Sequence, residues 1–296
     1  MGSRVRRKLF DKRGSGGVQP VQHWEKQTCN RVLFSLEVCR LRSITTVCIF
    51  PDVLSKDMRD ESQQVIERFW TTELGAESGF LAVIPQVCCT AQHLYSGVQL
   101  FRRDNRLIVV APSDRAEFIQ EAIEGFSVDD LFSAEWLQRV FGKDVERILG
   151  AAEVNYADDT SFRCNGRQAA QAISSSDSIA YRALASALDS KEIQDSGFSA
   201  ETFPAFGAFS KDILCAAASY TVWEPSIAHI IVATHPDYRR RGFASAAISA
   251  LAADAFDRGL ILQWRAISSN KNSLALARHL GFAHYCSTLF VRLRES

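Results

Sequence analysis

The sequence lacks any apolar run of the roughly 20 residues that a membrane-spanning helix needs. The stretch Ile44–Phe50 is short enough to be a single buried strand. The chain of 296 residues also lacks net charge, because 34 Lys and Arg balance 34 Asp and Glu. A neutral chain has no general attraction to polyanions. We therefore expect neither a membrane nor a nucleic acid as a partner.

Metal-ligand spacing is missing as well. The eight cysteines form no C-x-x-C pair, and no two histidines have the spacing of a zinc site. No secretory leader precedes the cysteines, so we interpret them as reduced thiols of a cytoplasmic protein. What the chain does have is a hydrophobic share of 47%, which over this length suits two domains better than one.

Residues 1–50 differ from the rest of the chain. They hold ten Lys and Arg against three Asp and Glu, and the glycine-rich stretch Gly14–Gly17 interrupts them. Such a basic segment is typical of a disordered leader, of an organelle transit peptide, or of an arm that binds phosphates. We favour the disordered leader, because runs of charge are usually just solvated.

Residues 51–160 predict a smaller α+β unit of unknown role. Apolar residues recur at helical spacing over 61–74, and Gly75 follows them. Extended runs predict strands at 80–87, 95–101 and 107–111. Ser113 and Ser127 are expected to begin two further helices. No catalytic set assembles here, and we expect this unit to shape the cleft of the second domain.

Residues 167–296 predict a second domain, with the polar stretch 157–166 as the boundary. Strands are predicted at 169–173, 205–209, 213–223, 227–234, 260–267 and 285–293. Helices are predicted at 178–188, 241–258 and 273–280. A loop rich in Ser and Asp is expected after the first of these helices.

The segment Ile230–Ser245 joins an apolar strand, a basic turn and the start of a helix. The first turn of a helix has free N–H groups and the positive end of the macrodipole, which together hold a phosphate. Gly242 and the small Ala244 would let a diphosphate approach the backbone closely. Arg239–Arg241 add cationic donors. The segment predicts anion binding, with solvated arginines at a helix start as the plain alternative.

The run Arg239-Arg-Arg-Gly242-Phe-Ala244 resembles the Q/R-x-x-G-x-G/A signature of the GCN5-related N-acetyltransferase (GNAT) superfamily. A second block, Asn270–Phe282, is similar to the family element N-x-x-A-x-x-L-Y-x-x-x-G-F. The order of elements from 169 to 293 also follows the family. The resemblance implies an α/β (α+β) fold, in which a GNAT-type mixed sheet flanked by helices follows the smaller α+β domain.

The resemblance also implies acetyl-coenzyme A (acetyl-CoA) as co-substrate, and no metal. The backbone of Val232, Ala233 and Thr234, where the strand splays from its neighbour, would pair with the pantetheine amides. The pyrophosphate would be held by the backbone amides of Arg239, Arg240, Arg241, Gly242, Phe243, Ala244 and Ser245. Asn270 would contact the pantetheine arm, with Ser273 nearby.

Two residues that many family members use in catalysis are replaced. The proton-donating Tyr corresponds to Ala277, and a Glu that serves as base corresponds to Ala228. The attacking amine must still lose a proton. His229, with a suitable pKa range, and Glu224, acting through a water, are the candidates for the base. Tyr285 is the candidate for the acid, and a structural role is the alternative for all three.

Arg265 lies inside the apolar run Leu260–Ile267, where an unpaired charge is expensive. It either meets an internal acid or faces the cleft. In the cleft it would bind a substrate carboxylate, beside Gln263 and Trp264. We favour the internal ion pair.

Together these features predict an N-acyltransferase that moves an acetyl group from acetyl-CoA to an amine by direct attack in a ternary complex. The acceptor would be a small-molecule or peptide amine, and a homodimer is left open. The alternative is a non-catalytic acyl-CoA-binding sensor or interaction module, which the loss of both family residues supports. A nucleic-acid binder built on the basic leader is a third reading, and its binding would fall steeply with salt.

Overall fold

The computed structural model of the chain describes residues 57–76, 81, 86–92, 97–164, 169–174 and 177–294. The predictions for residues 1–50, and for a domain start at residue 167, lie outside the described residues.

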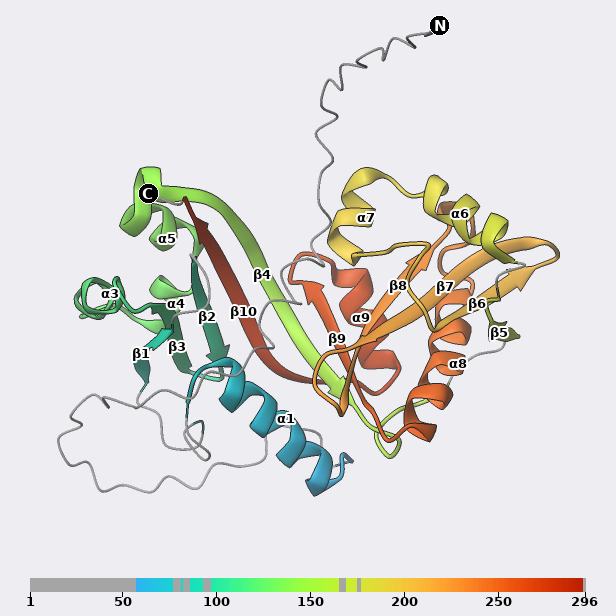
Figure 1. Cartoon of the computed structure of the whole chain (residues 1–296), viewed down its shortest axis with the longest axis horizontal. Coiled ribbons are helices and arrows are strands. Elements are labelled where there is room, and N and C mark those ends of the chain that lie inside the picture. The colour runs from blue at the N-terminus through green and yellow to red at the C-terminus, as the bar shows by residue number, and fades with distance from the viewer. Residues whose placement is uncertain are drawn as a thin grey trace, which may run out of the picture.

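The described strands form one ten-stranded mixed sheet in the order β1-β3-β2-β10-β4-β9-β8-β7-β6-β5 (Figure 1). Neighbours are antiparallel except for β1 with β3 and β8 with β9. The strands are β1 Val87–Gln92, β2 Gly97–Arg103, β3 Arg106–Pro112, β4 Val145–Ala157, β5 Ala170–Ala172, β6 Ala205–Ser210, β7 Ile213–Val222, β8 Ile227–Thr234, β9 Ile261–Ile267 and β10 Ala283–Leu293. The predicted α/β class with a large mixed sheet flanked by helices is confirmed.

Helices cover both faces of the sheet. The α-helices are α1 Asp60–Glu73, α3 Ala116–Ala122, α4 Val128–Leu131, α5 Ala134–Phe141, α6 Ser178–Ala187, α7 Ser190–Ser196, α8 Phe243–Asp257 and α9 Lys271–His279, and the 3-10 turns are η2 Gly142–Asp144 and η4 Pro236–Tyr238. Within the described part of the chain, none of these helices is both long and apolar enough to cross a membrane.

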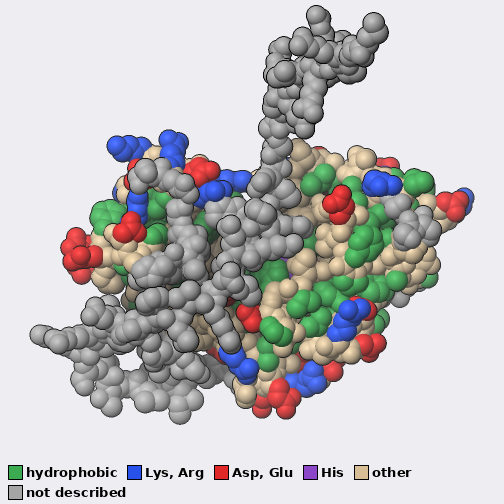
Figure 2. Space-filling model, viewed as in Figure 1, with side chains coloured by type: hydrophobic (Ala, Val, Ile, Leu, Met, Phe, Trp, Pro, Cys, Tyr) green, Lys and Arg blue, Asp and Glu red, His purple; other side chains and the backbone are tan. Residues whose placement is uncertain are grey.

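The sheet carries two lobes joined by its two longest strands (Figure 1). We call β1–β3 with α1 and α3–α5 the N-terminal lobe, and β5–β9 with α6–α9 the C-terminal lobe. Strands β4 and β10, the seam, pair with each other and run from one lobe to the other. In the space-filling view from the same side, hydrophobic side chains gather over the lobe that holds α8, and charged side chains lie along its lower edge (Figure 2).

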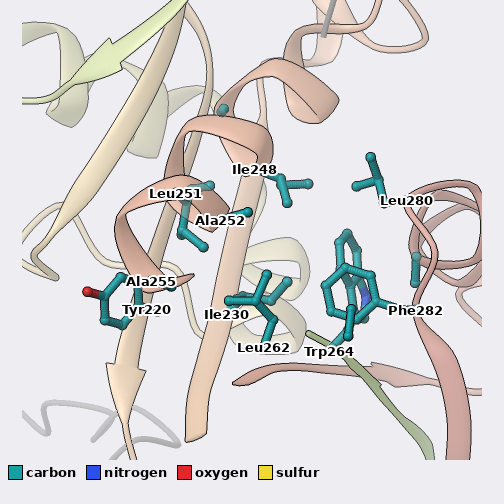
Figure 3. Packing of buried hydrophobic residues seen from close by; sticks show 14 of the residues in the cluster. Tyr220, Ile230, Ile248, Leu251, Ala252, Ala255, Leu262, Trp264, Leu280 and Phe282 are labelled. Carbon is teal, nitrogen blue, oxygen red and sulfur yellow. The ribbon is translucent and has the colours of Figure 1, made fainter. Parts of the chain in front are cut away.

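Small residues bring α8 close to the sheet. Ala252 and Ala255 of α8 are buried in one cluster with Ala228 and Ile230 of β8 (Figure 3). The next residue of the strand, Ile231, belongs to a separate cluster with α6. Side chains alternate between the faces of a strand, so β8 has helices packed on both sides. This packing fixes where the first turn of α8 lies relative to the end of β8.

Large aromatic side chains fill the core beneath α1. Trp70 packs against Phe101 of β2 and Tyr285 of β10, with ring centroids 5.0 and 6.2 Å apart. Tyr156 of β4 meets Tyr285 edge to face at 5.6 Å, a favoured arrangement of aromatic rings. The same cluster includes Ile227 of β8 and several residues of the seam. Helix α1 therefore covers the seam and reaches the C-terminal lobe.

Strand β4 is the main element that the sequence analysis missed. It lies between β9 and β10 and is the antiparallel partner of both. The described part of the predicted boundary beyond β4, residues 158–164, packs closely on the second sequence block. A Cβ placed on Gly281, whose φ is 87°, would lie 2.1 Å from the carbonyl oxygen of Ser161. Strands from both sides of residue 160 thus share one sheet, while the division into two domains stays a prediction.

Several element predictions in the N-terminal lobe were wrong in detail. Ser113 does not cap α3, because that helix begins at Ala116. Ser127 does begin a helix, with a capping box, but it ends at Leu131. Ser133 then caps α5, accepting a hydrogen bond from the Trp136 N–H at 3.1 Å. Two serine caps six positions apart begin two separate helices, where periodicity alone suggested a single one.

Two further differences concern loops. The Ser- and Asp-rich loop after α6 contains α7, which a capping box between Asp189 and Glu192 begins and left-handed Gly197 ends. The predicted strand at 80–87 lies mostly outside the described residues, and the strand observed there is β1, which begins at Val87. In both places, cap chemistry and tertiary pairing set the element bounds.

Candidate active site

The parallel pair β8 and β9 opens part of the way along its length. Registered pairing begins at Ile227 with Ile261 and ends at His229 with Gln263, although both strands continue. Val232, Ala233 and Thr234 pair on their other side with β7. Among the described residues, no strand pairs with the β9-facing edge of β8 beyond His229. The predicted splay of this strand is therefore present, and it leaves an edge to which an extended amide chain can add.

The first turn of α8 follows the end of β8. Its N-cap is Gly242, with φ 88°, and no side chain caps the helix. A Cβ placed on Gly242 would meet nothing within 4 Å, so the backbone is open to close approach on that side. Uncapped N–H groups at a helix start bind anions. These features fit a phosphate group at this turn.

The three arginines of the basic turn lie in different surroundings. Arg239 forms an ion pair with Glu192 of α7 and donates from Nε to the Thr234 carbonyl at 3.4 Å, so it ties α7 to the turn. The guanidinium of Arg241 lies 5.4 Å from the centre of the Tyr238 ring. Arg240 is exposed with a left-handed φ of 59°. Among the described residues, neither Arg240 nor Arg241 has a carboxylate partner, so their charge is available to an anion.

Asn270 and Ser273 lie beyond the end of β9, at the edge of the sheet that the end of β8 also reaches. Asn270 is the N-cap of α9, and its side-chain oxygen accepts from the Ser273 N–H at 3.1 Å. The Ser273 hydroxyl accepts from Nε1 of Trp264 at 3.0 Å. The carboxyl ends of neighbouring parallel strands form the usual crevice for ligands in such sheets. The structure therefore brings the two predicted coenzyme segments to one edge.

His229 and Gln263, the last registered pair before the split, are also joined through their side chains. Nδ1 of His229 lies 3.0 Å from Oε1 of Gln263, and Nε2 of Gln263 donates to the Tyr156 hydroxyl at 2.6 Å. Nε1 of Trp70 donates to the same hydroxyl at 2.8 Å. A carboxamide oxygen can only accept, so Nδ1 of His229 carries the proton. In the neutral ring, Nε2 then holds the lone pair.

The environment of His229 keeps the imidazole neutral. Trp223 stacks on the ring, with centroids 4.1 Å apart and an interplanar angle of 16°. Burial, aided by the positive charge of Arg265, lowers the pKa of His229 to about 4. The side chain is still partly exposed, so a substrate can reach it. A neutral, reachable imidazole with one free lone pair has the properties of a proton acceptor.

Charged groups gather beside this histidine. Burial, and then the negative charge of Glu224, raise the pKa of Glu73 at the end of α1, while Arg265 lowers it. Arg265 is exposed and donates to the Thr288 hydroxyl at 3.1 Å. Among the described residues it has no ion-pair partner, so the favoured internal pair was wrong. It shares a face of β9 with Gln263, whereas Trp264 is buried in the α8 cluster on the other face.

Three residues considered in the sequence analysis lie away from the opening between β8 and β9: Tyr285, Ala228 and Ala277. Tyr285 is fully buried and its hydroxyl accepts from Arg103 at 3.2 Å. Burial raises its pKa far above the usual range. Ala228 and Ala277 are both buried in the α8 cluster. The structure thus brings His229 and Glu224 to the same region but places Tyr285 behind α1, although the catalytic role of each stays a prediction.

Comparison with known proteins places the C-terminal part of the chain in a family. A sequence model described as GNAT acetyltransferase matches residues 197–288. This part of the chain belongs to the GNAT superfamily, which connects it with acetyl transfer in general. No curated protein of known function matches the chain in sequence.

Solved structures of this family resemble part of the chain. A protein assigned to the GNAT acetyltransferases from Novosphingobium aromaticivorans is 23% identical, with a TM-score of 0.42, over 51% of this chain and 67% of that protein. A GNAT acetyltransferase from Colwellia psychrerythraea is 14% identical, with a TM-score of 0.40, over 53% of this chain and 61% of that protein. YncA from Salmonella typhimurium, solved with its cofactor acetyl-CoA, is 14% identical, with a TM-score of 0.34, over 44% and 96%. The chain therefore spans about two thirds or less of the first two proteins.

Sequence reasoning missed the residues of the site that precede the family match. Trp70, Glu73 and Tyr156 all lie before residue 197, and no motif marks them. Strand β4 could have been found from the alternation of Ala152, Val154 and Tyr156. No sequence signal shows that these strand and helix residues reach His229.

Proposed function

We propose that this chain is an N-acyltransferase that moves an acetyl group from acetyl-CoA to an amine acceptor, a small molecule or a peptide, within a ternary complex. The observation that carries the proposal is the opening of the β8–β9 ladder after His229, next to the uncapped first turn of α8. An extended pantetheine chain and a pyrophosphate need these two features side by side. Family membership of residues 197–288 supports the same assignment.

The chain's residues fit this co-substrate. Backbone groups of Val232, Ala233 and Thr234 would pair with the pantetheine amides, and the amides from Arg239 to Ser245 would hold the pyrophosphate. Arg240 and Arg241 would add charge. When bound, acetyl-CoA supplies the thioester whose acyl group is transferred.

On the acceptor side, Nε2 of His229 would take the proton that the attacking amine loses. Glu224 and Arg265 would contact charged groups of the acceptor, with Arg265 suited to a carboxylate. No acid is needed for the leaving thiolate, because a thiol of normal pKa near ~8.5 leaves readily. The absence of a hydroxyl at Ala277 is therefore compatible with catalysis.

Calorimetric titration of acetyl-CoA into three proteins tests the coenzyme site: wild type, Gly242→Ala and Gly242→Glu. The alanine variant controls for the strain of a side chain at positive φ, which costs about 1–2 kcal/mol. We expect it to bind within a few-fold of wild type. The glutamate variant should bind at least about 100-fold more weakly, because its carboxylate repels the diphosphate. Equal affinity of the two variants, or no binding by folded wild-type protein, would contradict the site.

Thiol release with a panel of free amino acids, diamines, amino sugars and short peptides tests the reaction. Amine-dependent release in wild type, lost in Gly242→Glu, is the expected result. Binding of acetyl-CoA without release for any amine favours the alternative, a non-catalytic acyl-CoA sensor.

A further inference from the structure

A series of hydrogen-bonded side chains that ends at His229 connects the two lobes. Trp70 comes from α1 and Tyr156 from β4 of the seam, whereas Gln263 and His229 come from β9 and β8 of the C-terminal lobe. The three distances along it are 2.8, 2.6 and 3.0 Å. The Trp70–Tyr156 and Gln263–His229 distances are normal for hydrogen bonds, and the Gln263–Tyr156 distance is slightly shorter than is usual for an N–H donor.

The inner members of this hydrogen-bonded series of side chains are buried and have little access to water. Tyr156 is fully buried, Gln263 is 1% exposed and Trp70 is 4% exposed. An unmade bond would leave a buried polar group without a partner, which is costly. The polar groups of these three side chains therefore depend on one another for hydrogen bonds, since water cannot replace a lost partner.

The orientation of the Gln263 carboxamide decides which nitrogen of His229 is protonated. With its NH₂ group toward Tyr156, its oxygen faces the histidine and accepts from Nδ1. With the amide turned round, its NH₂ group would donate to Nδ1 and the proton would sit on Nε2, which then could not accept another. The structure shows the first arrangement, in which the Tyr156 hydroxyl accepts from both Trp70 and Gln263 and the carboxamide oxygen faces the histidine.

We propose that Trp70 and Tyr156 are positioning residues that act through Gln263 to hold His229 in the Nδ1-protonated tautomer, so that Nε2 accepts the proton of the substrate amine. This inference rests on the proposed function for the identity of that proton. It assigns to the N-terminal lobe a part in the reaction that the family match at residues 197–288 does not include. Stacking of Trp223 on the opposite side holds the plane of the ring.

The charged groups around the histidine agree with a neutral ring. Arg265 of β9 lies on the same face and disfavours the imidazolium. Glu73 of α1 lies within electrostatic reach of both Arg265 and Glu224, which is in the turn before β8. No carboxylate of the described residues bonds directly to the imidazole, so the Gln263 oxygen is its acceptor partner.

The tautomer can be measured without any substrate. Long-range proton–nitrogen spectra of the full chain labelled with ¹⁵N-histidine distinguish protonated from unprotonated ring nitrogens, and His229→Gln assigns the signals. At pH 7 we expect a neutral ring with Nδ1 protonated. In Tyr156→Phe and Trp70→Phe the second tautomer should become populated. Gln263→Glu keeps an oxygen acceptor, so it should retain the tautomer and raise the pKa of His229.

The catalytic part of the inference is tested by steady-state kinetics with the acceptor that the thiol-release panel identifies. We expect Tyr156→Phe and Gln263→Met to lower kcat by about 10- to 100-fold, within the range of general-base contributions, with KM for acetyl-CoA unchanged. Tyr220→Phe is the matched control, because Tyr220 is also a buried tyrosine whose hydroxyl bonds to a side chain, Asp254, at 2.7 Å. It should leave both the tautomer and kcat as in wild type.

Two outcomes would overturn the inference by itself. One is a wild-type His229 protonated on Nε2. The other is amine-dependent turnover in which Tyr156→Phe and Trp70→Phe change neither kcat nor the tautomer. A folded wild-type protein that binds acetyl-CoA but transfers its acetyl group to no amine would instead overturn the proposed function. The catalytic part of this inference would then fail with it.

Discussion

The two lobes are packed by different means. In the C-terminal lobe, α8 approaches the sheet through small residues such as Ala247, Ala252 and Ala255. In the N-terminal lobe, α1 rests on large aromatic rings, with Trp70 and Tyr156 at the centre. The alanine contacts set the distance between α8 and the sheet, and so place the first turn of α8 at the end of β8. Aromatic contacts supply an indole N–H and a phenol hydroxyl, polar tips that reach toward the neighbouring lobe.

This difference shows how the two lobes divide one site. Small side chains let α8 pack close to the sheet and so place its first turn beside the end of β8, while amphipathic aromatics fill the opposite face and orient polar groups. The seam carries both functions, because β4 pairs with β9 along the edge that faces away from the split. Experiments that separate the lobes or change either kind of packing test this division.

The largest expected effect comes from removing the N-terminal lobe together with β4. A fragment of residues 160–296 would leave β9 without its partner from Ala152 to Ala157, and β10 without either neighbour. We expect this fragment to lack cooperative thermal unfolding by circular dichroism, because its buried strands would have unpaired backbone groups. The full chain is the control. A fragment with a sharp unfolding transition would show that the C-terminal lobe is an independent domain.

Next in size is the loss of the central aromatic ring of the N-terminal lobe. Trp70→Ala should lower the free energy of unfolding by about 3–5 kcal/mol, as expected for removal of a buried tryptophan. Trp70→Phe keeps most of the packing and should lower it far less. Urea titrations of both variants measure the difference. Nearly equal losses in the two would mean that the hydrogen bond to Tyr156, and not the packing, dominates.

A carboxylate in the seam should make the free energy of unfolding depend on pH. The carboxylate of Glu153 on β4 accepts from Ser287 of β10 at 2.6 Å and from Ser268 after β9 at 2.5 Å, and it pairs with His284 at 2.9 Å. These partners, the His284 hydrogen bond foremost, lower its pKa from 4.5 to about 2. The folded carboxylate stays charged where the unfolded one takes up a proton. Stability is therefore complete above pH 4.5 and falls as pH drops toward 2.

Glu153→Gln tests this dependence. We expect wild type to lose on the order of 2 kcal/mol over this pH range from this group, a value reduced for solvent screening at the half-exposed His284. The variant should be less stable at pH 7 and show a smaller slope between pH 4.5 and 2. Chemical unfolding at several pH values measures both. Parallel curves for the two proteins would rule out Glu153 as a source of the slope.

The smallest expected effect separates stability from binding at the basic turn. Arg240 has a left-handed φ of 59°, which favours glycine. Arg240→Gly should therefore change the free energy of unfolding by no more than about 1 kcal/mol, with relief of strain offset by a more flexible unfolded chain. The same change should weaken acetyl-CoA binding several-fold, because one cation is lost. Calorimetry that finds unchanged affinity would exclude Arg240 from the coenzyme site.

Much of the C-terminal lobe was predictable from local patterns. Strand β8 was predicted with its observed bounds, and the start of α8 within two residues, because an apolar run, a basic turn and a glycine follow one another. The N-terminal lobe was predicted less well. Short helices such as α4 and α5 are separated by only two residues, Phe132 and the capping Ser133, which periodicity does not detect. Strand β4 is partly exposed at its start and buried only toward its end, so its alternation of apolar and polar residues is confined to the stretch from Ala152 to Tyr156.

The sequence by itself determined the parts of this protein that depend on neighbouring residues. The strand ending at Thr234, the left-handed Gly242 and the uncapped helix after it lie within a dozen residues, and their chemistry indicates an anion site. Tertiary structure alone decided the partners of His229. Trp70, Tyr156 and Gln263 are separated by up to 193 positions in the chain and meet because β4 is inserted between β9 and β10. Strand pairing of this kind depends on which edges remain open once the other strands have formed, and no local pattern records it.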